Sequence, residues 1–319
     1  MRGGYNTCIV FARALLGLTV VALGGASAWA AAPSTPKIGG CAVFPASSVW
    51  NQRVDSLAVA SNSATLVRSI GLDSSVHPDF GSGLYDGHKI GIPYVVVSGK
   101  ATPKSRVSFD YADESDKGPY PIPAAVPIEG DPNPGDGDRH ALIVARDTCT
   151  LYELYALHRQ GGAWAGGSGA IWSLGSNKLR PAGWTSADAA GLPILPGLAR
   201  YDEVKAGAIT HALRFTASRT RNTYIYPARH QASSSTDPAL PPMGLRVRLK
   251  ASFKTAGYPP QARIVLEALK RYGMILADNG SPWYISGAPD ARWSNDQLHT
   301  LGQVRGSDFE VVDTSHLRP

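Results

Sequence analysis

Prolines and glycines interrupt this chain so often that long helices have little room to form. Its 319 residues include 34 glycines and 24 prolines, and only 18% are charged. Residues 118–138 form the longest proline- and glycine-rich run, where proline cannot donate to a strand ladder. A loop of that length is uncommon in a compact domain unless it has a function or is disordered. The composition therefore favours short strands joined by turns over a helical bundle.

The strand and helix patterns agree with this expectation. The clearest β-hairpin spans 139–159, where two apolar strands flank a turn at 146–148. Further strands are expected at 90–97, 107–111, 208–216, 223–230 and 244–253, and residues 274–286 are expected to form two strands joined by a turn at Asn279-Gly280. Short helices are expected at 62–71, 185–191, 200–207, 259–273 and 294–302. We predict a mainly β fold: an antiparallel sandwich or jelly-roll-like domain with a few short peripheral helices, formed by residues 41–319 as a single β-rich catalytic or binding domain.

The first 30 residues have the pattern of a secretory signal peptide. Two arginines accompany an apolar run at 14–22, and a small-x-small sequence ends at Ala30. The run is too short for a permanent membrane span, which disfavours the alternative of an anchor. We therefore expect a secreted or periplasmic chain with no membrane contact after cleavage, with 31–40 as a flexible leader.

Cysteine usage fits export. Cys8 lies in the signal segment, so Cys41 and Cys149 are the two cysteines left after cleavage. An even pair in an oxidising compartment predicts one disulfide bond. Lipidation of Cys41 is the alternative, but the preceding sequence "KIGG" lies far beyond the apolar run.

Several classes of function have no signal in this sequence. The net charge of +6 comes without a dense lysine and arginine run, so we expect no nucleic-acid partner. No zinc-protease or phosphate-loop motif is present, and the histidines are far apart in sequence, so we predict no cofactor and no metal. A metal-dependent hydrolase remains open only if three histidines converge. We expect a monomer.

Candidate carboxylates lie in three different settings. Glu153 is in the middle of an apolar strand, where it either faces solvent or lines a cleft that raises its pKa. Asp202 begins a short helix, where an acid commonly interacts with the helix dipole. Asp188 is the only charged residue between Arg180 and Arg200, and it either caps a helix or is buried with a partner.

Two histidines complete the candidate catalytic set. His211 lies in an apolar strand, where a core histidine bonded to a carbonyl is the alternative to a catalytic role. His230 ends a strand and opens a polar loop, a position where catalytic and binding residues are common. The candidate substrate-binding residues lie in loops or beside them, with aromatic rings able to stack on sugars: Asp79, Tyr85, His140, Trp172, Trp184 and Arg229.

Several segments resemble a family of secreted bacterial proteins that has no assigned activity. They are "GDRHALIV", "GWTSADAAGLPILPGLARYDEV", "HALRFT", "PARH", "PPMGLR" and "YGMILADNG", spread across nearly the whole chain after the signal segment. Some members of that family are similar to chains that carry carbohydrate-binding modules. The resemblance implies a polysaccharide or oligosaccharide partner, and it carries no catalytic residues to this sequence.

These observations lead to three hypotheses about function. The first is a secreted glycoside hydrolase, in which Glu153 and either Asp202 or Asp188 form the required pair of carboxylates and His211 or His230 tunes their protonation. A polysaccharide lyase would instead use His230 as the base and Arg229 to neutralise a uronate. The last is a non-catalytic carbohydrate-binding or cell-envelope protein, which needs only aromatic and polar loop groups.

Overall fold

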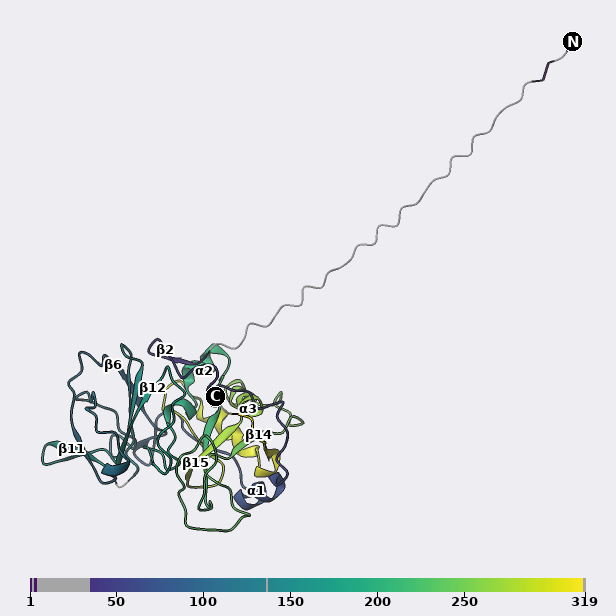
Figure 1. The fold of residues 1–319 in the computed structure, drawn as a ribbon. Helices are drawn as coiled ribbons and strands as arrows, with labels where there is room; N and C mark the ends of the chain where they lie inside the picture. The colour runs from purple at the N-terminus through teal and green to yellow at the C-terminus, as the bar shows by residue number, and fades with distance from the viewer. Residues whose placement is uncertain (2, 5–34, 136, 318–319) are drawn as a thin grey trace. The chain divides into compact units, whose positions relative to one another are not determined.

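The computed structural model describes residues 1, 3–4, 35–135 and 137–317. The described residues from 35 onward belong to the larger of two units of the chain, Ser34–Pro319, which is compact. The predicted signal peptide lies almost entirely outside the described residues and is not tested by them. In the larger unit, β6 (Tyr94–Val97), β11 (Ala163–Gly166) and β12 (Ser168–Ser173) lie on one side (Figure 1). On the other side lie β14 (Arg246–Leu249), β15 (Met274–Asn279) and α3 (Pro260–Arg271). Within the described residues, no helix combines the length and the apolar composition needed to cross a bilayer.

Strands dominate the larger unit, which confirms the prediction of a mainly β fold. A four-stranded sheet has the order β12-β9-β8-β6, with β6 at Tyr94–Val97, β8 at Ala141–Ala145, β9 at Thr150–Tyr155 and β12 at Ser168–Ser173. A six-stranded sheet has the order β17-β14-β15-β13-β16-β3, with β3 at His77–Asp79, β13 at Leu213–Ala217, β14 at Arg246–Leu249, β15 at Met274–Asn279, β16 at Tyr284–Ser286 and β17 at Phe309–Val311.

Three smaller sheets complete the strand content. A three-stranded sheet joins β7 (Val107–Phe109), β10 (His158–Gln160) and β11 (Ala163–Gly166), and two short ribbons pair β1 (Lys37–Ile38) with β2 (Cys41–Ala42) and β4 (Leu84–Tyr85) with β5 (His88–Lys89). The helices are α1 (Ser63–Ile70), α2 (Tyr201–Ala206), α3 (Pro260–Arg271) and α4 (Asn295–His299), with 3₁₀ turns η1 (Ala112–Glu114), η2 (Leu195–Gly197), η3 (Thr300–Gln303) and η4 (Gly306–Asp308).

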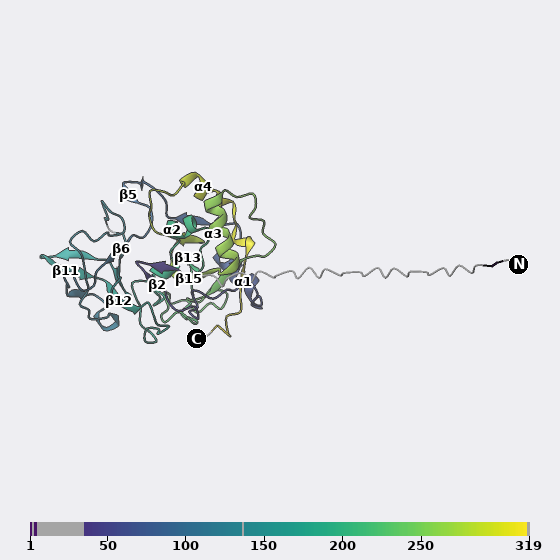
Figure 2. The ribbon, with the colours of Figure 1, turned by 90° about the horizontal axis from the view of Figure 1, so that it is seen from above.

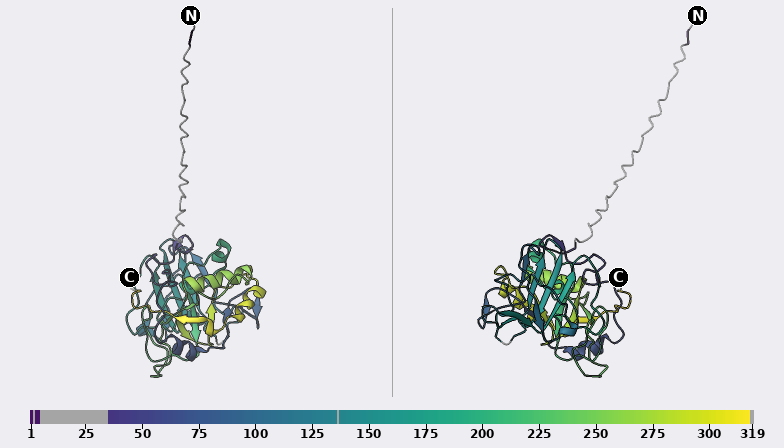
Figure 3. Two further views of the ribbon diagram at one scale, coloured as in Figure 1. Left: turned by 90° about the vertical axis from the view of Figure 1, so that its right-hand side faces the viewer. Right: turned by 60° about the vertical axis from the view of Figure 1, so that its left-hand side comes forward.

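The predicted hairpin is formed by β8 and β9, which pair antiparallel with Ala145 opposite Thr150. β8 reads as a continuous apolar run because both of its faces are covered. Leu142 and Val144 belong to the larger core cluster, whereas Ala141 and Ile143 belong to a smaller cluster on the opposite face. The right-hand view of Figure 3 shows the teal strands of this sheet from the front.

The sheets are mixed, so the expectation of a purely antiparallel fold is wrong. β13 pairs parallel with β15, β16 with β3, β6 with β8, and β11 with β7. Parallel neighbours require a long crossover connection. The crossover between β13 and β15 contains β14 and α3. β13 lies between β15 and β16 in the sheet, so the hairpin predicted across Asn279-Gly280 is wrong: its two strands are not paired with each other.

Four of the five predicted helices are present. α3 begins after Pro259 and buries Val265, Leu266 and Leu269. It contacts β14 and α4, and the view from above shows α4 next to one end of α3 (Figure 2). The helix predicted at 185–191 is wrong, because Ser186 uses its hydroxyl to bond the backbone of Asp188 and Leu192, which competes with helical bonds.

The strand predicted at 223–230 is also wrong. The segment contains only an isolated bridge between Tyr224 and Met243. Pro227 lies within it and has no N–H group to donate to a neighbouring strand.

The disulfide between Cys41 and Cys149 is confirmed. Its S–S distance is 2.05 Å, and it joins β2 to the turn between β8 and β9 across 108 positions of sequence. The bond ties β2 to the turn that joins the two central strands of the four-stranded sheet.

Replacing both Cys41 and Cys149 with serine is expected to lower the free energy of unfolding by about 4 kcal/mol, because a cross-link of this span restricts the unfolded chain. Urea unfolding followed by tryptophan fluorescence measures the change. Reduced wild-type protein serves as the control and is expected to match the double variant. Equal urea midpoints for oxidised and reduced wild type would contradict the prediction.

Candidate functional site

A cavity of about 360 Å³ gathers titratable side chains that are far apart in sequence. We call it the His140 pocket. It is lined by Tyr111, Glu114, Asp138, His140, Tyr155, Ser168, Thr185, Ser186, Ala187, Ala189, His230, Ala232, Asp278 and Asn279. Asp278 and Asn279 end β15 of the six-stranded sheet, while Tyr155 ends β9 and Ser168 begins β12 of the four-stranded sheet. Both large sheets thus contribute to a single concave site, the usual setting for a ligand.

A buried ion pair lies beneath this pocket. The Nε and Nη2 atoms of Arg214 donate to the two carboxylate oxygens of Asp188 at 2.9 and 2.7 Å, and Nη1 donates to Ser286 Oγ at 2.5 Å. Burial alone would lower the pKa of Arg214, but the charge of Asp188 and its hydrogen bonds outweigh that effect and raise it. Both side chains are almost fully buried, and the two parallel N–H···O bonds hold the pair in a fixed position.

Asp278 extends from this ion pair into the pocket. Its carboxylate lies 4.0 Å from Arg214 Nη2, and its side chain is 27% exposed. Burial and the negative charge of Asp188 raise the pKa of Asp278 to about 7, although Arg214 and a hydrogen bond from the Asn279 amide act in the opposite direction. A carboxyl group with this pKa holds a proton close to neutral pH, which is a property of general acids.

His140 has hydrogen-bond partners at both ring nitrogens. Nδ1 lies 2.5 Å from Glu129 Oε2, and Nε2 lies 2.9 Å from the carbonyl oxygen of Ala187. Burial favours the neutral ring, but the charge and hydrogen bond of Glu129 raise the pKa of His140 to about 9.

Glu129 is affected in return. Burial favours its protonated form, but the charge of His140 and the hydrogen bonds from His140 together outweigh burial and lower the pKa of Glu129. Burial, and then the charge of Glu129, raise the pKa of Asp79, one of the predicted binding residues. Two carboxyl groups of this region therefore have pKa values shifted in opposite directions: that of Glu129 is lowered and that of Asp79 is raised.

Three of the predicted residues belong to this region. His140 and His230 line the pocket, and His230 Nδ1 lies 3.0 Å from the Ala189 carbonyl oxygen. Asp188 is the buried partner of Arg214, which matches the sequence alternative of a buried, partnered acid. Arg229 is next to His230 in sequence, but its Nε donates to the Arg180 carbonyl oxygen at 2.9 Å.

Glu153 does not line the His140 pocket. Its side chain is fully buried and accepts hydrogen bonds from the amides of Ile194 and Leu195 and from Trp172 Nε1, at 2.8 to 3.1 Å. Burial raises the pKa of Glu153 to about 7 against these bonds. Glu153 therefore holds the start of η2 in place. The sequence predicted that it would either face solvent or line a cleft, and it does neither.

The remaining predicted acid and base lie elsewhere. Asp202 has a 71% exposed side chain, pairs with Arg292 at 2.9 Å, and borders a different cavity of about 640 Å³. His211 is 1% exposed and lies 3.1 Å from Glu203 and 2.8 Å from the Ala212 carbonyl oxygen. The structure thus does not unite Glu153, Asp202 and His211 in the His140 pocket.

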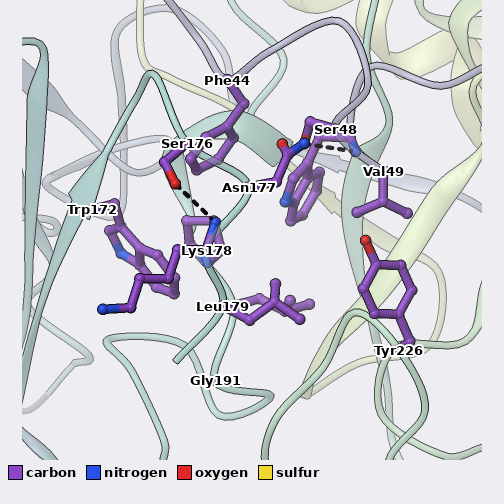
Figure 4. Close-up of a pocket in the computed structure, with 13 residues that line it drawn as sticks. Phe44, Ser48, Val49, Trp172, Ser176, Asn177, Lys178, Leu179, Gly191 and Tyr226 are labelled. Carbon is purple, nitrogen blue, oxygen red and sulfur yellow. Dashed lines mark hydrogen bonds between the residues drawn. The ribbon is translucent and has the colours of Figure 1, made fainter. Parts of the chain in front are cut away.

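The predicted aromatic residues occupy separate positions. Tyr85 is 77% exposed on the β4–β5 hairpin. Trp172 and Trp184 border a groove of about 470 Å³, with the Arg180 guanidinium over both rings at 5.7 and 5.4 Å from their centroids. Trp172 also borders the cavity shown with Leu179 and Tyr226 in Figure 4, whose volume of about 20 Å³ is too small for a sugar ring.

Sequence reasoning missed five charged residues of this region: Glu114, Glu129, Asp138, Arg214 and Asp278. A signal existed for two of them. Arg214 interrupts the apolar strand "HALRFT", and Asp278 ends the buried strand "MILAD". A charge within or at the end of an otherwise apolar strand requires a partner or an opening.

Comparison of the chain with protein-family models, with curated proteins and with solved structures gave no match.

Replacing Glu153 with glutamine is expected to lower the free energy of unfolding by about 1–3 kcal/mol, because the new amide group would face N–H donors in a buried site. Urea unfolding checks this, with Asp113→Asn at an exposed position of η1 as the matched control. A variant as stable as wild type would show that Glu153 does not anchor η2.

Proposed function

We propose that this chain is an exported hydrolase that cleaves glycosidic bonds of a polysaccharide in the His140 pocket. The observation that carries the proposal is the position of Asp278: partly buried, open to a cavity, and beside a fixed arginine–aspartate pair. Two other carboxylates, Asp138 and Glu114, line the same cavity. Glycoside hydrolysis needs one carboxyl group as proton donor and a second as base or nucleophile.

The roles follow from these positions. Asp278 donates its proton to the glycosidic oxygen as the bond from the anomeric carbon to that oxygen breaks. Asp138 or Glu114 accepts a proton from the water that adds to the anomeric carbon, so the two products gain the elements of one water molecule. We assign these roles in place of the pair formed by Glu153 and Asp202, because those two side chains do not line this pocket.

A polymer fits the surroundings better than a small sugar. The Arg180–Thr185 segment contributes Thr185 to the His140 pocket and Trp184 to the neighbouring groove, so the two hollows lie on either side of one short segment. Aromatic and polar groups in that groove suit sugar rings. The predicted signal segment and the disulfide, which is typical of oxidising compartments, support a secreted or periplasmic location.

We also propose that the two large sheets pack face to face. One core cluster contains Leu142 and Leu151 of the four-stranded sheet together with Leu213 and Phe215 of the six-stranded sheet. In this proposal the two sheets are the layers of a sandwich, and the His140 pocket lies where their edges meet.

A carbohydrate-binding protein without catalysis is the second candidate. The groove along Trp172, Arg180 and Trp184 favours it, because this groove needs no reaction to bind a sugar. The lyase alternative has less support, since Arg229 Nε is already bonded to a backbone carbonyl.

Asp278→Asn is expected to lower the rate of cleavage by about 100-fold or more, because it removes the proton donor while keeping the shape of the side chain. Release of reducing ends from a panel of plant, algal and bacterial polysaccharides measures the activity, and co-sedimentation with the same polysaccharides measures binding. Asp296→Asn on the exposed surface of α4 is the matched control. Binding without cleavage by wild type would favour the second candidate, and equal cleavage by both variants would remove Asp278 from catalysis.

The cleavage rate is expected to fall as the pH rises through about 7, because burial and Asp188 raise the pKa of Asp278 to about 7 and only its protonated form can donate. The dependence of kcat/KM on pH between 5 and 9 tests this. A rate that stays constant or increases from pH 6 to pH 8 contradicts the assignment of Asp278 as the acid.

A further inference from the structure

We propose that Glu129, Asp138 and His140 bind one divalent transition-metal ion, Zn²⁺ or Mn²⁺, in the wall of the His140 pocket. One ligand atom from each side chain lies within 4.8 Å of the other two. Asp138 and His140 are two positions apart just before β8, and Glu129 comes from the preceding proline-rich loop. The inference does not depend on the proposed hydrolysis.

The environment of His140 is the first argument for this site. His140 is 3% exposed, and its Nε2 lies 2.9 Å from the carbonyl oxygen of Ala187, which can only accept a hydrogen bond. Nε2 therefore carries a proton. Nδ1 is then the ring nitrogen that remains for a metal ion, and it faces Glu129 at 2.5 Å. A histidine whose second nitrogen donates to a backbone carbonyl is the usual form of a metal ligand.

The local balance of charge is the second argument. Two carboxylates, those of Glu129 and Asp138, lie within 4.8 Å of a single imidazole nitrogen. Across 35–135 and 137–317, no lysine or arginine forms an ion pair with Glu129 or Asp138. Arg214, the cation that acts on Glu129, is already bonded to Asp188 and Ser286. A divalent cation bound at this position would balance both carboxylates.

Access and ligand chemistry are consistent with such an ion. Asp138 is exposed and both Asp138 and His140 line the cavity, so an ion can enter from the pocket and keep open coordination positions toward it. One imidazole nitrogen with two carboxylate oxygens is a donor set that suits Zn²⁺ and Mn²⁺. No sequence pattern indicated this site, because only one of its three ligands is a histidine.

The test is isothermal titration of Zn²⁺ and of Mn²⁺ into chelator-treated protein purified without a histidine tag. We expect saturation at about one ion per chain, and affinity lower by at least about tenfold in Asp138→Asn and His140→Gln. Asp296→Asn and His299→Gln, two exposed substitutions on α4, are the matched controls and should bind as wild type does.

Asp138→Asn decides the outcome if His140→Gln fails to fold, because Asp138 is an exposed side chain outside the core. Circular dichroism confirms that this variant is folded. The proposal is overturned if wild type binds neither ion, or if Asp138→Asn binds as tightly as wild type. The titration measures the binding of the metal ion and no enzymatic activity, so its result does not depend on whether the protein hydrolyses a polysaccharide.

Discussion

The ion pair of Arg214 and Asp188 is the interaction on which the arrangement of the pocket depends. Arg214 extends from β13 near the middle of the six-stranded sheet and holds Asp188 through two hydrogen bonds and Ser286 of β16 through a third. Removing one partner of such a buried pair costs about 3–5 kcal/mol, because the other charge is left without compensation. The pair thereby fixes the turns at 185–191, which form one wall of the His140 pocket.

The same pair determines how charge is distributed around the pocket. Asp278 lies beside Arg214 but also near Asp188, and burial adds to the effect of Asp188, so its pKa rises. Glu129 is buried as well, yet the protonated form of His140 lowers its pKa. The pKa of Asp278 is thus raised and that of Glu129 is lowered within one small region. Many active sites contain such a pair, in which one carboxyl group acts as the acid and the other as the base.

Other buried charges in this protein have a different purpose. Glu153 accepts amide hydrogen bonds at η2, and Arg246 donates to the carbonyl oxygens of Val49, Gln52 and Tyr272. These side chains satisfy backbone groups that would otherwise be buried without partners. Burial of a charge therefore does not by itself identify a functional residue, and Asp278 differs from Glu153 because it opens onto a cavity.

The sequence alone determined the β-rich class, the β8–β9 hairpin, four short helices and the disulfide, because each depends on local periodicity, on turn residues or on a simple count of cysteines. It also identified His140, His230 and Asp188, which the tertiary structure places in the pocket or beneath it. Only the tertiary structure decided that Asp278, Glu129 and Asp138 join them and that Glu153 does not. These residues are brought together by a mixed sheet with long crossovers, and neither the pairing of distant strands nor the direction of a buried carboxylate is encoded in any short stretch of sequence.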